Sequence, residues 1–132
     1  MSVNQKHINM KKLFLIVNVL LVFSFVNAQN KCNGYVFKLK NGTIEKYDAS
    51  GVNKQSSMMY DILDFDCNEE EIAVIKTDGT IAFYNHDGNI KFSCSNGAKK
   101  IKYLDSNTYV VTKTDGSMRK YEIGGCNDRG PF

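Results

Sequence analysis

Short apolar runs separated by turn residues cover most of this chain, and their spacing predicts β-strands. The run 72–76 is rich in β-branched residues and is followed by Asp78-Gly79, a pair typical of tight hairpin turns. In the next run, 80–84, apolar Ile81 and Phe83 fall on one face of a strand. No clear apolar stripe recurs at the 3.6-residue period of a helix. We therefore expect an all-β fold.

One eleven-residue pattern is written three times, at residues 41–51, 78–88 and 115–125, with steps of 37. It consists of Asn or Asp, Gly, Thr or Ser, an apolar residue, two variable residues, Tyr, three variable residues and Gly. A period of this length indicates a repeat architecture, in which one unit of several strands stacks on its copies. We expect a three-repeat antiparallel β array with up to four short strands per period, and about ten strands in all.

The segment 42–48, Gly-Thr-Ile-Glu-Lys-Tyr-Asp, resembles the middle of a β-propeller blade of the WD-repeat or a related type. The aromatic–acid pair of such blades is complete in Tyr47-Asp48 and approximate in Tyr84-Asn85 and Tyr121-Glu122, and the Gly-His mark of true WD repeats is absent. The resemblance covers roughly residues 33–125. It implies about three incomplete blades and no catalytic residues.

Three blades are fewer than the four or more that close a typical propeller. A homodimer completing a six-bladed ring would solve this problem, as would an open stack braced by disulfides. The alternative fold is a β-trefoil, whose threefold symmetry also takes about twelve strands. We favour the propeller-like array, because little sequence remains after Gly125 for the last strand of a trefoil.

The first 28 residues have the features of a secretory signal peptide. Lys11-Lys12 precedes an apolar run, and Val26-Asn27-Ala28 supplies small residues at a cleavage site. The run is shorter than the roughly 20 residues that span a membrane. We expect cleavage after Ala28, a single domain at 29–132, and a secreted or periplasmic protein that does not stay in the membrane.

The net charge of the chain after residue 28 bears on whether it binds nucleic acid. Of the 17 lysines and arginines three precede Ala28, whereas all 14 acidic residues follow it, so the remaining chain has no formal net charge. An overall attraction to nucleic acid is therefore not expected.

The four cysteines predict two disulfides, as is typical of small exported domains. Cys32 and Cys67 occupy the same place in successive copies, which favours the pairing Cys32–Cys67 with Cys94–Cys126. The rival pairing joins Cys32 to Cys126. No two cysteines have the spacing of a zinc knuckle, and we expect neither metal nor cofactor.

Two charged clusters are the remaining surface candidates. The acidic one contains Asp64, Asp66, Glu69, Glu70 and Glu71, and it fails the calcium-loop pattern because Glu69 replaces the glycine. We interpret it as a solvated turn. The basic cluster, Lys99, Lys100 and Lys102, is interpreted as a solvated loop that is open to an anionic partner.

Catalytic patterns are scarce. His86 lies in a predicted turn, and the repeated Tyr47, Tyr84 and Tyr121 are interpreted as packing residues rather than as a sugar site. We expect no enzyme, but an exported binding module for a protein or glycan. The alternatives are an inhibitor or immunity-type protein that acts on a secreted enzyme through residues 61–71, and a remnant of a longer propeller.

Overall fold

The computed structural model of the chain describes residues 26–95, 97–122 and 126–132. These residues form three four-stranded antiparallel sheets, here called blades 1 to 3. Blade 1 contains β1 (Val26–Cys32), β2 (Tyr35–Lys40), β3 (Thr43–Tyr47) and β4 (Lys54–Met59). Blade 2 contains β5 (Ile62–Cys67), β6 (Ile72–Lys76), β7 (Thr80–Tyr84) and β8 (Ile90–Ser95). Blade 3 contains β9 (Ala98–Tyr103), β10 (Thr108–Lys113), β11 (Met118–Glu122) and β12 (Asn127–Pro131).

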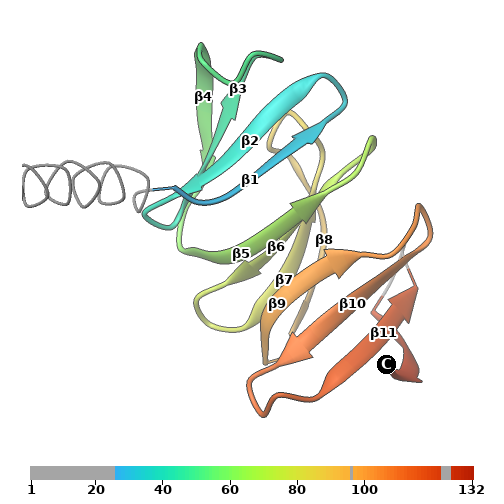
Figure 1. Cartoon of the computed structure of the whole chain (residues 1–132). Helices are drawn as coiled ribbons and strands as arrows, with labels where there is room; N and C mark the ends of the chain where they lie inside the picture. The colour runs from blue at the N-terminus through green and yellow to red at the C-terminus, as the bar shows by residue number, and fades with distance from the viewer. Residues whose placement is uncertain (1–25, 96, 123–125) are drawn as a thin grey trace, which may run out of the picture.

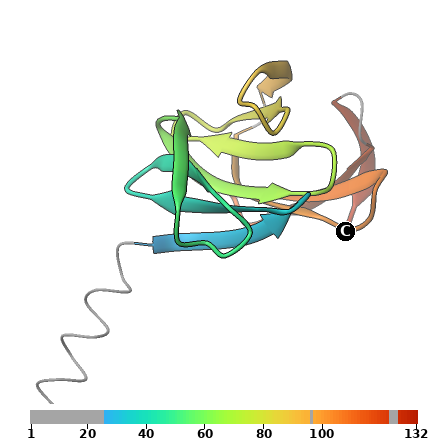
Figure 2. The same ribbon diagram turned by 90° about the horizontal axis from the view of Figure 1, so that it is seen from above.

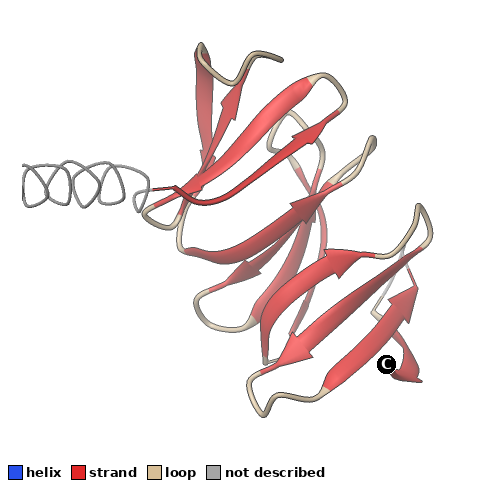
Figure 3. Ribbon diagram, viewed as in Figure 1, coloured by secondary structure: helices blue, strands red, loops and turns tan. Residues whose placement is uncertain are grey.

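The blades follow one another as a fan, with blade 2 between the other two (Figures 1 and 2). Each strand pairs only with its neighbours in the chain, so each sheet is built from one repeat. This is the arrangement of propeller blades, and not that of a trefoil, where strands of different copies pair in one barrel. The described residues contain no helix, and hence none that could cross a membrane (Figure 3). The expected all-β, propeller-like fold is confirmed.

The described residues form twelve strands, where the sequence predicted about ten. The sequences of β1 and β12, VNAQNKC and NDRGP, do not alternate between apolar and polar residues. Both are strands because their backbones pair with β2 and β11. The predicted signal peptide lies outside the described residues except for residues 26–28, with which β1 begins. Cleavage after Ala28 stays a prediction.

The apolar core lies between the blades. One cluster joins blades 1 and 2, and a second joins blades 2 and 3. Strand β6 serves both, since Ile72 and Val74 belong to the first cluster while Ala73 and Ile75 belong to the second. All four side chains are fully buried, which explains why this strand is apolar at consecutive positions.

The outward faces of the two end blades carry polar residues at positions that are apolar in blade 2. The pair Val74 and Ala82 on β6 and β7 is replaced in blade 1 by Lys38 and Glu45. On the other face of blade 2, Ala73 pairs with Phe83, and the matching pair in blade 3 is Val110 and Lys120. Polar outer faces are typical of the terminal units of repeat proteins.

The repeated Asn-Gly and Asp-Gly turns connect each blade to the next. The carbonyl of Gly42 accepts a hydrogen bond from Ile62 N–H at 2.9 Å, and that of Gly79 accepts one from Ala98 N–H at 3.1 Å. Each donor is the first residue of its strand, Ile62 of β5 and Ala98 of β9. The repeat motif therefore fixes where the following blade begins.

A matched pair of glycine substitutions tests this role. Gly79 and Gly116 hold the same turn position with φ of +86° and +87°, but a Cβ on Gly79 would lie 3.0 Å from Gly97 Cα, whereas one on Gly116 meets nothing within 4 Å. We expect Gly116→Ala to lower the free energy of unfolding by about 1 to 2 kcal/mol through backbone strain alone. Gly79→Ala should cost about 1 to 3 kcal/mol more, because backbone atoms must move apart. Urea unfolding measures both, and equal losses would contradict the close approach of blades 2 and 3.

Candidate functional site

Two aspartates on β5 hold blade 3 by its backbone. Asp64 Oδ2 accepts a hydrogen bond from Ile101 N–H at 2.9 Å, and Asp66 Oδ2 accepts one from Tyr103 N–H at 2.8 Å. Both donors lie on β9, an edge strand of its sheet. The first strand of each blade, β1, β5 or β9, is here called its inner strand, because these strands contact one another from blade to blade. Burial raises the pKa of the Asp64 carboxyl, against the lowering effect of its bond from Ile101. The interpretation of these residues as part of a solvated turn is wrong, because the aspartates lie in a strand between blades.

Asp66 contacts all three inner strands. Its Oδ1 accepts hydrogen bonds from the Asn30 side-chain amide of β1 at 3.1 Å and from the Cys67 N–H of its own strand at 2.9 Å. Together with the bond from Tyr103, these contacts place one carboxylate at the meeting point of the blades.

The glutamates of the acidic segment separate in the structure. Glu69 and Glu70 are exposed in the turn after β5, whereas Glu71 is buried, with Oε1 3.7 Å from Lys91 Nζ. Burial raises the pKa of the nearby Tyr103 hydroxyl, and the Glu71 carboxylate adds to this effect. Within the described ranges no three His, Cys, Asp or Glu side chains are grouped to hold a metal ion.

His86 connects blade 1 to blade 2. Its ring stacks on Phe37 with centroids 5.6 Å apart, and Nε2 lies 2.9 Å from the carbonyl oxygen of Asn68. Lys46 of β3 donates to the His86 carbonyl at 3.1 Å, and its Nζ lies 3.9 Å from the centre of the Tyr35 ring. The sequence pointed to a turn at His86 but gave no signal for these contacts, because its partners are far away in the chain.

The cysteine pairs lie between adjacent blades. Cys32 and Cys67, at the ends of β1 and β5, have Cα atoms 6.1 Å apart, and those of Cys94 and Cys126 are 6.0 Å apart. Both disulfides follow the favoured pairing rather than the rival one. The first connects blade 1 to blade 2, and the second connects β8 of blade 2 to the residue that precedes β12 of blade 3.

The repeated tyrosines pack within and between blades. Tyr121 is buried in the cluster between blades 2 and 3 and stacks on Tyr109, with ring centroids 5.4 Å apart. Tyr84 is partly buried and packs on the cluster between blades 1 and 2. Tyr47, also buried, belongs to the outward face of blade 1.

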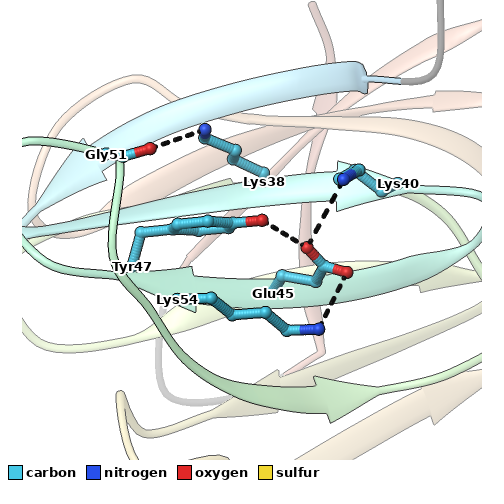
Figure 4. Close-up of polar contacts among 6 residues, drawn as sticks. All are labelled: Lys38, Lys40, Glu45, Tyr47, Gly51 and Lys54. Carbon is cyan, nitrogen blue, oxygen red and sulfur yellow. Dashed lines mark hydrogen bonds and ion pairs between the residues drawn. The ribbon is translucent and has the colours of Figure 1, made fainter.

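That outward face is covered by a network of charged side chains around Glu45 (Figure 4). Tyr47 Oη donates to Glu45 Oε2 at 2.6 Å, while Lys54 and Lys40 lie 3.2 and 3.9 Å from its carboxylate. Lys38 crosses the Tyr47 ring and donates to the Gly51 carbonyl at 2.7 Å. The polar groups of this face therefore bind one another.

The outward face of blade 3 is different, because it contains a groove of about 410 Å³. Apolar and basic side chains line it together with Asp64 of blade 2, among them Lys100, Lys102, Leu104, Val110, Met118 and Phe132. Leu104, Met118 and Phe132 are 45%, 41% and 64% exposed, and both lysines are exposed as well. A smaller hollow lined by Leu63, Asp64, Lys99 and Lys100 adjoins it.

The sequence identified the basic cluster Lys99, Lys100 and Lys102 but placed it in a loop, and that placement is wrong, since all three lysines lie on β9. Alternation puts Lys100 and Lys102 on the same face as their cross-strand partners Thr112 and Val110. The apolar residues were missed. Met118 holds the repeat position of Ile44 and Ile81, which are fully buried, so its pattern predicts a core residue.

Removal of the Asp66 carboxylate should weaken the whole array. Asp66→Ala leaves the Asn30, Cys67 and Tyr103 donors without their acceptor, and we expect the free energy of unfolding to fall by about 2 to 4 kcal/mol. Asp105→Ala is the matched control, because Asp105 also accepts two backbone N–H groups, those of Asn107 and Thr108, but within a single exposed turn. Urea unfolding should show a clearly smaller loss for the control. Equal losses would mean that Asp66 does not join the blades.

The contact between Tyr47 and Glu45 predicts a dependence on alkaline pH. The hydrogen bond to Glu45 raises the pKa of Tyr47 to about 12. The folded state thus favours the protonated phenol, and its stabilising effect is complete below the ordinary pKa of about 10 and lost as the pH rises from there to 12. Tyr47→Phe should lose less stability than the parent between pH 9 and pH 12 in urea unfolding. An unchanged pH profile would rule out this hydrogen bond.

No protein-family model matches the chain, and no curated protein matches it. Solved structures are similar in fold. The N-terminal domain of Nup159 superposes with a TM-score of 0.60 at 12% identity, over 78% of this chain and 35% of that chain. The C-terminal WD40 domain of Sif2 superposes with a TM-score of 0.60 at 13% identity, over 79% of this chain and 33% of that chain.

The β-propeller domain of Cps50 (Swd1) from Myceliophteria thermophila gives a TM-score of 0.62 at 5% identity, over 79% of this chain and 38% of that chain. The chain thus spans about a third of the length of the propeller chains that it matches. Identities this low establish the fold alone. The described residues form a propeller-like array of three blades.

Proposed function

We propose that this chain is an exported, non-catalytic interaction module that binds a segment of a protein partner on the outward face of blade 3. The groove there carries the proposal. Seven large apolar side chains are strongly exposed among the described residues, and four of them, Leu63, Leu104, Met118 and Phe132, line the groove or the hollow beside it. Apolar side chains gathered on a surface mark sites of interaction.

The contrast between the two ends of the array supports this choice. On blade 1 the outward lysines are engaged by Glu45, Tyr47 and the Gly51 carbonyl. On blade 3, Lys100 and Lys102 line a hollow whose walls are largely apolar, and Lys100 lies near the Asp64 carboxylate of blade 2. A hollow of this composition suits an apolar side chain flanked by polar groups.

The non-catalytic part of the proposal rests on what the candidate catalytic groups do. Asp64 and Asp66 accept backbone hydrogen bonds from blade 3, and His86 is held between Phe37 and Asn68. These side chains serve contacts between blades. We expect neither cofactor nor metal.

Export is supported by the two disulfides, which form and persist in oxidising compartments such as the periplasm or the extracellular space. The inhibitor alternative depended on the segment 61–71. Asp66 and Glu71 of that segment are occupied or buried in the array, whereas Leu63 and Asp64 line the groove or the hollow beside it, so part of the segment belongs to the proposed binding surface.

Selection from a displayed library of random peptides on the immobilised, oxidised domain tests the proposal. We expect enriched peptides whose binding is lost in Leu104→Ser/Met118→Asp, because these changes remove apolar walls of the groove. The matched control is Val52→Asp, since Val52 is 75% exposed in the connection between β3 and β4 of blade 1, and the residues that line the groove belong to blades 2 and 3. Fluorescence anisotropy of each selected peptide measures the affinities.

Two outcomes would contradict the proposal. If no peptide is enriched over a bare surface, the chain is not a peptide-binding module. If peptides are enriched but bind the groove variant and the parent equally well, the groove is not the site.

A further inference from the structure

The charge of the groove can be compared with that of an occupied inter-blade surface within the same molecule. Lys100 and Lys102 follow Asp64 and Asp66 by 36 residues, and each lysine has the same place in its sheet as the corresponding aspartate. Asp64 pairs with Ile75 and Asp66 with Ala73, while Lys100 pairs with Thr112 and Lys102 with Val110. The groove on blade 3 therefore matches the surface of blade 2 that β9 covers.

On blade 2 the occupied surface takes an extended strand. The two aspartates accept the Ile101 and Tyr103 N–H groups of β9, two residues apart, and the apolar side chain of Ile101 enters the adjoining cluster. The backbone N–H groups of alternate residues in β9 thus bind carboxylates of β5, while the Ile101 side chain packs against apolar residues beside them.

On blade 3 the sign of the charge at these two strand positions is reversed, and Asp64 of blade 2 lines the same groove beside Lys100. Lysine ammonium groups are donors without any acceptor, so they cannot take backbone N–H groups as the aspartates do. They suit carbonyl oxygens and above all carboxylates. The apolar wall is kept, since Val110, Met118 and Phe132 line the same groove.

Building on the proposed function, we propose that this groove binds an extended segment of a partner protein in which acidic residues alternate with apolar ones. Two carboxylates at positions i and i+2 of the segment contact Lys100 and Lys102. The apolar residues between or beside them contact Val110, Met118 and Leu104. The segment lies where the inner strand of a following blade would lie.

A second copy of this chain is a poorer occupant. To continue the fan, the outward face of blade 1 would have to cover the groove, and that face presents Lys38, Lys40 and Lys54 around a single carboxylate, that of Glu45. Its lysines would approach Lys100, Lys102 and Lys120 on blade 3. Like charges facing one another oppose this contact.

The test uses a fluorescein-labelled, acetylated eight-residue peptide that alternates aspartate with valine, and the same peptide with asparagine in place of aspartate. Fluorescence anisotropy with the oxidised protein should show binding of the acidic peptide that weakens as salt rises from about 0.05 to about 0.5 M. We expect the asparagine peptide to bind at least about tenfold more weakly, because its side chains carry no charge. Lys100→Glu/Lys102→Glu should weaken the acidic peptide by at least a similar factor.

The matched control is Lys31→Glu, which reverses an exposed lysine on the inner strand of blade 1 and should leave the affinity unchanged. A far-ultraviolet spectrum and a urea midpoint close to those of the parent show that the double variant is folded. Equal binding of the two peptides, or an unchanged affinity of the folded double variant, would overturn the acidic specificity. The proposed function would survive in that case if library peptides still need Leu104 and Met118.

Two further results would also overturn this inference. One is binding of heparin to the lysine pair together with failure of both peptides, which would identify a polyanion as the ligand. The other is a dimer mass in sedimentation velocity that returns to the monomer mass in Lys100→Glu/Lys102→Glu, which would identify a second copy as the occupant.

Discussion

The array depends on how one inner strand is held against the next. A blade of four short strands cannot bury its apolar faces alone, and an edge strand leaves backbone groups without partners. Asp64 and Asp66 accept hydrogen bonds from two backbone N–H groups of the edge strand β9, and Asp66 also binds the side chain of Asn30 on β1. The Asn-Gly and Asp-Gly turns add one backbone bond at the start of each following blade. Apolar packing supplies most of the burial, while these polar contacts fix the position of each blade.

The three described blades leave two outward faces that no other described blade covers. These faces carry charged residues at positions where blade 2 has apolar ones. The charged residues are Lys38 and Glu45 in blade 1 and Lys120 in blade 3. In blade 1 these side chains form a connected network (Figure 4). An additional blade packed on this face would have to remove the charged groups from water, at a cost that a salt bridge rarely recovers.

The sequence was sufficient to predict features that are local in the chain. The hairpin turns at Asp78-Gly79 and the strands on either side follow from residue types a few positions apart. Contacts that depend on distant residues could not be predicted. Asp66 resembles any acidic turn residue until Tyr103 and Asn30 are known to lie beside it. Met118 resembles a core residue because its position is buried in the two earlier copies, whereas its side chain is exposed on blade 3. Strand β12 is specified by pairing with β11 rather than by its own composition.

The two outward faces differ in a way that solubility alone does not require. A terminal unit stays soluble with polar residues across its surface, as blade 1 has. Blade 3 instead keeps Leu104, Met118 and Phe132 exposed around a hollow, which carries a cost in water and a risk of aggregation. The lysines at the inner edge reduce that risk, because an approaching copy of blade 3 meets like charge. In the proposed complex they would leave the apolar walls accessible to an acidic segment, so the same two residues would both oppose self-association and select a partner.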